Sequence, residues 1–165
     1  MFKIIFRGIC NEWDDFPGQN GYLQIDVNGY TYGDYYPEEL DGIMDQIDLS
    51  DWIERLVRVK EGLKKAEYVV LSDVDAYETW IEFKKKFTDV VVSIVTCEKW
   101  DGSMDIEYHL DNPKISDWGN QVITFDEFEN EIDRAAEAYL AYLKSVNNDD
   151  ELLKQVESRL IRECS

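Results

Sequence analysis

Basic residues are missing from the first third of this chain. Residues 8–54 contain no lysine or arginine but hold twelve aspartates and glutamates, and the whole chain has a formal net charge of −19. Charge of this sign opposes binding to nucleic acid and to anionic membranes, and it speeds encounters with basic partners. We therefore expect neither a nucleic-acid nor a membrane partner. The simplest role for the charge is solubility alone.

Cysteine and long apolar runs are also scarce. The three cysteines, Cys10, Cys97 and Cys164, are an odd and scattered set that argues against a disulfide framework and fits a reducing cytosol. No apolar run reaches the roughly 18 residues needed to span a bilayer. The opening "MFKIIFRGIC" is broken by Lys3 and Arg7 and lacks a small-residue cleavage site, so we expect no secretory signal. These absences predict a cytoplasmic protein.

Recognisable catalytic and metal-binding motifs are absent. His109 is the only histidine, and we interpret it as a solvent-facing strand residue, because one histidine without a nearby partner makes a poor metal site. Close carboxylates occur at residues 73–75 and 101–105, but neither group has the spacing of a calcium loop. No nucleophile elbow or phosphate-binding glycine loop is present. We expect a protein that is not an enzyme and has no cofactor and no metal.

The chain nevertheless has enough apolar sequence for a folded core, at 44% hydrophobic residues over a length that suits one domain. Asn28-Gly29 predicts a two-residue type I′ hairpin turn, with Leu23, Ile25, Val27, Tyr30 and Tyr32 on one face. In the segment 103–110, alternation predicts that Met104, Ile106, Tyr108 and Leu110 point inward. Strands are expected over residues 2–8, 21–33 (two strands), 67–73, 77–100 (two strands), 103–110 and 118–125.

Three segments have helical spacing of apolar residues. The first covers residues 48–66, with Ser50 as its expected N-cap. The second opens with a capping box formed by Thr124 and Glu127, and the third covers residues 151–163. We therefore predict an α+β domain over residues 1–147, with a mostly antiparallel sheet packed by two main helices. Residues 148–165 are expected to form an acidic link and a short C-terminal helix.

Aromatic residues accompany the acidic ones in two expected loops, at residues 12–16 and 34–45. Aromatic side chains ringed by acids are typical of protein-interface hot spots, although each single aromatic could equally fill the core. A basic partner that normally grips phosphate would fit such a surface, because carboxylates can occupy the phosphate sites. The predicted partner contacts are Glu12, Trp13, Asp14, Asp15, Asp34, Tyr35, Tyr36, Glu38, Glu39, Asp41 and Asp45.

Three sequence blocks carry a family resemblance: "FRGICNEW" (6–13), "YVVLSDVDAYETWIEFKK" (68–85) and "WGNQVITFDEFENEI" (118–132). With these blocks the chain, over residues 1–147, resembles the small cytosolic immunity proteins of bacterial polymorphic toxin systems, such as wall-associated or contact-dependent toxins. The resemblance implies a non-enzymatic protein that binds and blocks the C-terminal toxin domain of its own locus, often a nuclease. The resemblance does not identify which residues of this chain contact the partner.

Two alternatives remain open at the level of sequence. The protein could be a nucleic-acid mimic or adaptor that binds another basic partner, which a basic non-toxin protein in a pull-down would favour. It could instead be a carboxylate-based metal-binding domain or enzyme, which cation-dependent stabilisation would favour. High net charge favours a monomer when the protein is free.

Overall fold

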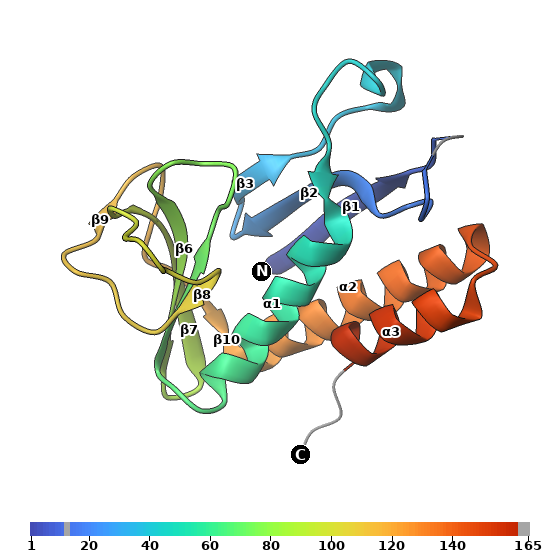
Figure 1. Cartoon of the computed structure of the whole chain (residues 1–165). Coiled ribbons are helices and arrows are strands. Elements are labelled where there is room, and N and C mark those ends of the chain that lie inside the picture. Colours follow the sequence, from blue (N-terminus) through green and yellow to red (C-terminus); the bar gives the residue numbers. More distant parts are fainter. Residues whose placement is uncertain (12–13, 162–165) are drawn as a thin grey trace.

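The computed structural model describes residues 1–11 and 14–161 and confirms the α+β class. The strands divide between two antiparallel sheets, against which three helices pack (Figure 1). The first sheet has the order β1-β2-β3, with β4 beside β2, and contains β1 (Phe2–Ile9), β2 (Asn20–Val27), β3 (Tyr30–Asp34) and β4 (Ile47–Asp48). The second has the order β10-β7-β6-β5-β8, with β9 beside β7, and contains β5 (Tyr68–Ser72), β6 (Thr79–Lys86), β7 (Asp89–Thr96), β8 (Ile106–Glu107), β9 (Lys114–Ile115) and β10 (Gln121–Thr124). The helices are α1 (Leu49–Leu63), α2 (Phe125–Val146), α3 (Asp150–Leu160) and the short 3₁₀ helix η1 (Glu38–Leu40).

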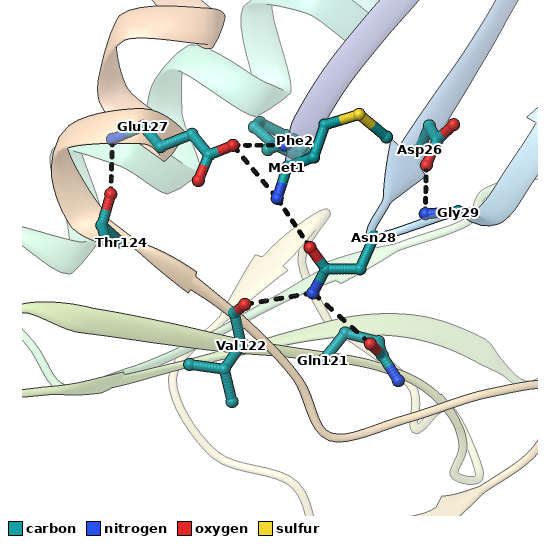
Figure 2. A network of polar contacts seen from close by, with 9 residues as sticks. All are labelled: Met1, Phe2, Asp26, Asn28, Gly29, Gln121, Val122, Thr124 and Glu127. Atoms are coloured by element: carbon teal, nitrogen blue, oxygen red, sulfur yellow. Dashed lines mark hydrogen bonds and ion pairs between the residues drawn. The ribbon is translucent and has the colours of Figure 1, made fainter.

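The predicted hairpin turn between β2 and β3 is confirmed. Asn28 and Gly29 have φ angles of 56° and 93°, and a type I′ turn needs positive φ at both positions. The Asn28 side chain accepts a hydrogen bond from the main-chain nitrogen of Met1 at 2.6 Å and donates one to the Val122 carbonyl at 3.1 Å. Figure 2 shows how these contacts join the turn to β10. The turn therefore ties the first sheet to the second.

Side chains of α2 cover the β1 edge of the first sheet. The main-chain N–H groups of Phe2 and Ile4 donate to the carboxylates of Glu127 and Glu131, at 2.8 and 2.7 Å. Arg134 donates to the Ile4 carbonyl at 2.9 Å. These side chains satisfy main-chain groups that a neighbouring strand would otherwise bond. The opposite edge of the sheet is β3.

The N-cap of α1 is Asp48, and the prediction of Ser50 was wrong. The Asp48 carboxylate accepts from the Asp51 N–H at 3.0 Å, because pairing of β4 with β2 holds Asp48 in extended conformation directly before the helix. For α2, the predicted cap is confirmed by the bond from the Glu127 N–H to Thr124 Oγ1, at 3.1 Å. The Glu127 carboxylate accepts a hydrogen bond from the Phe2 N–H. Of the two reciprocal hydrogen bonds of the predicted capping box, the described structure therefore contains the one from the Glu127 N–H to Thr124.

The second sheet contains the predicted hairpin of β6 and β7, whereas the segment 103–110 departs from its prediction. Only β8 pairs there, with Val70 and Leu71 of β5. Ile106 and Leu110 are buried, but Met104 and Tyr108 are exposed, so their predicted inward orientation was wrong. The alternating pattern fails because only Ile106 and Glu107 pair with the sheet, so Met104 before them and Tyr108 after them have no fixed inner face.

One hydrophobic core joins both sheets and all three helices. Helix α2 contributes its predicted apolar stripe, with Phe128, Ile132 and Tyr139 almost fully buried. Helix α3 contributes Leu153, Val156 and Leu160 to the same core. A smaller cluster around Trp80 lies on the second sheet and includes Val70, Val95, Cys97 and Leu110. Burial on both faces explains the near-continuous apolar run of β7.

Candidate acidic binding site

The acidic segment that follows β3 forms a loop projecting from the first sheet, at the top of Figure 1. It passes through η1 and returns to the sheet at β4. Pro37 precedes η1, and Gly42, with a φ of 83°, adopts a conformation that favours glycine. No residue of η1 is buried, and Glu38 and Glu39 are both exposed. Residues 35–44 are called the acidic loop below.

One arginine holds the acidic loop in place. Arg7, on β1, donates to both carboxylate oxygens of Asp41, at 2.8 and 2.9 Å, and to the Tyr36 carbonyl, at 2.6 Å. Its guanidinium carbon lies 5.4 Å from the ring centroid of Tyr22 and 6.0 Å from that of Tyr35. The hydrogen bond from Arg7 lowers the pKa of Asp41. Asp41 is thus satisfied within the protein, and the loop is anchored to β1.

The two tyrosines of the loop have different environments. Tyr36 is half-buried and packs edge-to-face on Tyr22, with ring centroids 5.1 Å apart. Desolvation, and then the charge of Asp34, raise the pKa of Tyr36. Tyr35 is 42% exposed and therefore offers an aromatic surface to a partner.

Beside the acidic loop, a cleft of about 480 Å³ opens between the two sheets. Its walls come from β2 and β3, the start of α1, and the loops that follow β5 and precede β10. Asp34 and Asp45 lie at the two ends of the acidic loop, so the loop and the cleft form one continuous region. Apolar lining comes from Leu23, Ile25, Ile47, Trp52 and Ile81. The acidic cleft is defined by its five aspartates, Asp34, Asp45, Asp73, Asp75 and Asp117.

Hydrogen bonds across the cleft join its walls. The Tyr32 hydroxyl on β3 donates to the Asp73 carboxylate in the loop after β5. The Trp118 indole N–H donates to the Thr31 carbonyl at 2.9 Å. The Asp73 carboxylate also accepts from the main-chain N–H of Asp75, at 3.0 Å. These contacts fix the edge of the first sheet against the second.

The aspartates of the cleft have no basic partner in the part of the chain that the structure describes. None of the ion pairs between described residues involves any of the five. Lys99 lies nearby, but it donates to the main-chain carbonyls of Asp73 and Ala76. Burial, the hydrogen bond to Asp73 and the charges of Asp73 and Asp117 raise the pKa of Tyr32. The cleft is therefore a region of negative potential whose aspartates form no ion pair with the described residues, with Lys99 as a nearby positive charge.

The predicted contact residues are distributed over three places. Asp34 and Asp45 line the cleft. The acidic loop carries Tyr35, Glu38 and Glu39, which are exposed, together with the internally engaged pair Tyr36 and Asp41.

The remaining predicted contacts belong to the loop between β1 and β2. Asp14 is half-buried and accepts from the Asn11 N–H at 2.7 Å, so it serves the loop itself. Asp15 is exposed. Glu12 and Trp13 lie outside the described residues.

Three of the five cleft aspartates were missed as partner contacts. Asp73 and Asp75 form a close pair of carboxylates, a pattern that in sequence suggests only a metal site. Asp117 stands alone in its loop and carries no local signal. The long-range packing of β3 beside the loops at residues 73–75 and 117 brings these side chains together.

The described residues offer little other chemistry. They contain no group of three or more His, Cys, Asp or Glu side chains arranged to hold a metal ion. His109 is exposed, as predicted, but it lies after the end of β8 and not in a strand, so that part of the prediction was wrong; it lies 2.8 Å from Asp111. Cys97 is buried, which raises the pKa of its thiol. No helix within residues 1–11 and 14–161 is long and apolar enough to cross a membrane.

Comparisons with protein-family models, with curated proteins and with solved structures found no match to this chain. The acidic loop and the acidic cleft therefore provide the basis for inferring function. Their shared features are exposed or cleft-lining carboxylates, one exposed tyrosine, and a rigid attachment to both sheets.

Proposed function

We propose that this protein is a non-enzymatic inhibitor that binds a basic protein partner through the acidic loop and the acidic cleft. The observation that carries the proposal is the absence, among the described residues, of any ion pair to Glu38, Glu39 or the cleft aspartates, although Arg7 fixes the loop that carries Glu38 and Glu39. Unneutralised carboxylates on a fixed surface attract lysines and arginines and speed association.

The partner that fits best is the toxin domain of a bacterial toxin–immunity pair. The resemblance of residues 6–13, 68–85 and 118–132 to immunity proteins supports this choice. A nuclease toxin exposes cationic groups that normally bind phosphate, and a fixed row of carboxylates can occupy the same places. Tyr35 supplies the exposed aromatic anchor expected near the centre of such an interface.

The cost of these carboxylates to stability also supports a binding role for the acidic loop and the acidic cleft. Crowded carboxylates weaken a fold through mutual repulsion, and surface charges without a function are easily exchanged for neutral residues. Among the described basic side chains, Arg7 forms an ion pair with Asp41, and none forms an ion pair with Glu38, Glu39 or the cleft aspartates. A binding role explains why so many acids are concentrated here at the expense of stability.

Affinity capture with matched variants tests the proposal. The tagged protein is expressed in its own host as wild type, as a site variant (E38Q, E39Q, D45N) and as a control variant (E67Q, D101N, E137Q). Both variants remove three exposed carboxylates, with the same residue types. Bound proteins are identified by mass spectrometry at two salt concentrations.

We expect wild type and control to retain a basic C-terminal domain that the site variant loses. Expressed alone, that domain should arrest growth, and co-expressed wild type should restore it. A basic partner without toxicity would support the adaptor or mimic function in place of immunity. Equal capture by the site and control variants would contradict the proposed surface.

A further inference from the structure

The end of the molecule opposite the acidic loop is basic, although the whole chain has a net charge of −19. Of the 17 lysines and arginines, residues 55–65 hold five and residues 84–86 hold three. A groove of about 480 Å³ lies here between the end of α1 and the β6–β7 turn, lined by residues 63–67 and 85–87. It is called the basic groove below.

Four lysines and one acid are among the residues that line the basic groove. The ion pairs between described residues include Lys64, which lies 3.1 Å from Glu129, but they do not include Lys65 or Lys86. Both of these side chains are exposed. The groove therefore presents positive charge to a molecule that enters it.

An aromatic residue of the basic groove is both exposed and strained. Phe87 follows β6 in a two-residue turn, between the paired residues Lys86 and Asp89, and it is 98% exposed. Its φ is 57°, in the left-handed region where bulky residues are rare and where hairpin turns usually have Gly or Asn. The ring is almost fully in water, so packing within the described protein does not explain it. A strained and exposed aromatic residue indicates contact with another molecule.

The acidic loop, at the other end, has the complementary chemistry. Glu38 and Glu39 are exposed and form no ion pair with described residues. Ile43, in the same loop, is 72% exposed. The loop projects from the first sheet, and a projecting loop can enter a groove (Figure 1). One element thus offers acids for the lysines of the groove and an apolar side chain for Phe87.

We propose that the acidic loop of one copy of this chain occupies the basic groove of the next copy, with Glu38 and Glu39 paired to lysines and Ile43 packed against Phe87. The two surfaces lie at opposite ends of the molecule (Figure 1). One contact therefore leaves a loop and a groove open, and the assembly grows as a head-to-tail chain instead of closing as a dimer. One loop in one groove is a small interface, which favours a weak and reversible contact.

The net charge opposes this association over long distances but not at contact. Charges farther apart than about 8 Å are largely screened at physiological salt, whereas oppositely charged groups a few Å apart still attract each other. The protein is therefore expected to be a monomer when dilute and to associate at high concentration.

Chain formation competes with the binding of a basic partner, because both use Glu38 and Glu39. A basic partner should therefore dissociate the chains. This consequence rests on the proposed function, whereas the contact between copies does not.

Sedimentation velocity of the free protein tests the contact, over about 5–500 μM at about 0.15 M NaCl. The loop variant is E38Q/E39Q and the groove variant is K65Q/K86Q. Their controls, E98Q/E137Q and K144Q/K154Q, each remove two exposed charges of the same residue type elsewhere. For wild type and both controls, we expect a sedimentation coefficient that rises with concentration.

Each site variant should associate at least about tenfold more weakly than wild type. The loop variant is the sharper of the two, because the loss of two negative charges would by itself favour association of an acidic protein. A wild-type sedimentation coefficient that stays constant with concentration would overturn the proposal, as would an equal effect of the controls.

A mixture of the two site variants tests the head-to-tail arrangement. The loop variant keeps its basic groove, and the groove variant keeps its acidic loop. An equimolar mixture should therefore form heterodimers and nothing larger, although neither variant associates alone. A mixture that sediments as monomers, at concentrations where wild type associates, would overturn the arrangement.

The variant F87N separates the contact from folding, because Asn adopts positive φ more readily than Phe. We expect F87N to melt no lower than wild type and to associate at least about fivefold more weakly. Unchanged association of F87N would overturn the contact between Ile43 and Phe87.

A different occupant of the basic groove is tested by titration with a short oligothymidylate, which offers phosphates and bases. Binding that K65Q/K86Q abolishes, together with no self-association of wild type, would overturn the second copy as occupant. Self-association and capture of a basic partner are separate measurements, so either proposal can fail while the other stands.

Discussion

Arg7 is the residue on which the acidic loop depends most. It is the last basic residue before the acidic stretch, and it bonds Asp41 and the Tyr36 carbonyl at once. Because Arg7 lowers the pKa of Asp41, the pair adds stability at pH values above the ordinary carboxyl pKa. That contribution is lost as the pH falls through the lowered pKa of Asp41.

The first prediction concerns this titration. In the variant R7Q, the pKa of the Asp41 carboxyl should rise towards its ordinary value of 3.8, because the charged hydrogen-bond partner is gone. Carboxyl ¹³C chemical shifts recorded against pH measure the change, with Asp101 as an unaffected reference. An unchanged Asp41 titration would show that Arg7 does not hold the loop in solution.

Gly33 shapes the β3 wall of the cleft. Its φ is 91°, and a Cβ at this position would lie 2.4 Å from the Leu23 carbonyl oxygen. We predict that G33A lowers the free energy of unfolding by about 1–3 kcal/mol, measured by urea denaturation. Gly102 is the matched control, since its φ is 87° and its Cβ would meet nothing within 4 Å. Equal losses for G33A and G102A would remove the steric part of this explanation.

At the scale of elements, α2 acts as a side-chain cover for the β1 edge. Replacing Glu131 with alanine leaves the Ile4 N–H without its acceptor and frees Arg134 from its acidic neighbour. We predict that E131A costs about 1–3 kcal/mol in urea denaturation, the usual penalty for a buried donor left unpaired. The variant E137A, at an exposed position of the same helix, should cost less than about 0.5 kcal/mol. Similar losses for both variants would mean that the edge is protected in another way.

Elements with strong local signals were predictable from sequence. Asn28-Gly29 fixes its own turn, and Thr124 caps its own helix, because the interactions lie within a few residues. Ser50 and Asp48 are both good capping residues, and the choice between them depends on the pairing of β4 with β2, which is not local. Tyr108 fits an alternating pattern in sequence, but it lies just beyond the two-residue strand β8 and is exposed.

The site was predictable only where charge is dense along the chain. The acidic loop stands out in sequence because its acids lie close together without a basic residue, and the segment that contains it ends in Asp34 and Asp45, which line the cleft. The cleft itself needs β3 to pack beside two loops that lie far away in sequence. That packing brings in Asp73, Asp75 and Asp117, which no local pattern connects to residues 34–45.

The charge of the whole molecule is unevenly arranged. The acidic loop lies at one end of the molecule, whereas several lysines gather at the other, around the end of α1 and the β6–β7 turn (Figure 1). Such an arrangement orients the protein as it approaches a basic surface, because the acidic end is attracted and the other is repelled.

Repulsion at the acidic end should be measurable as lost stability. We predict that the double variant D45N/D117N melts about 2–4 °C higher than wild type at low salt, which corresponds to roughly 1 kcal/mol. The gain should shrink as NaCl screens the repulsion. Calorimetry with D101N/E137Q as control measures the effect. An equal rise in melting temperature for the control would mean that the repulsion comes from the total net charge and not from the acidic cleft.

The association rate of the captured partner, measured by stopped flow at increasing NaCl, tests most directly whether the acidic loop and cleft form the binding surface. For wild type and the E67Q/D101N/E137Q control, we predict a rate that falls steeply with salt. For E38Q/E39Q/D45N, we predict a slower rate at low salt and a shallower dependence, because steering charges have been removed. Identical rates and salt dependences for the two variants would contradict the proposal that this surface binds the partner.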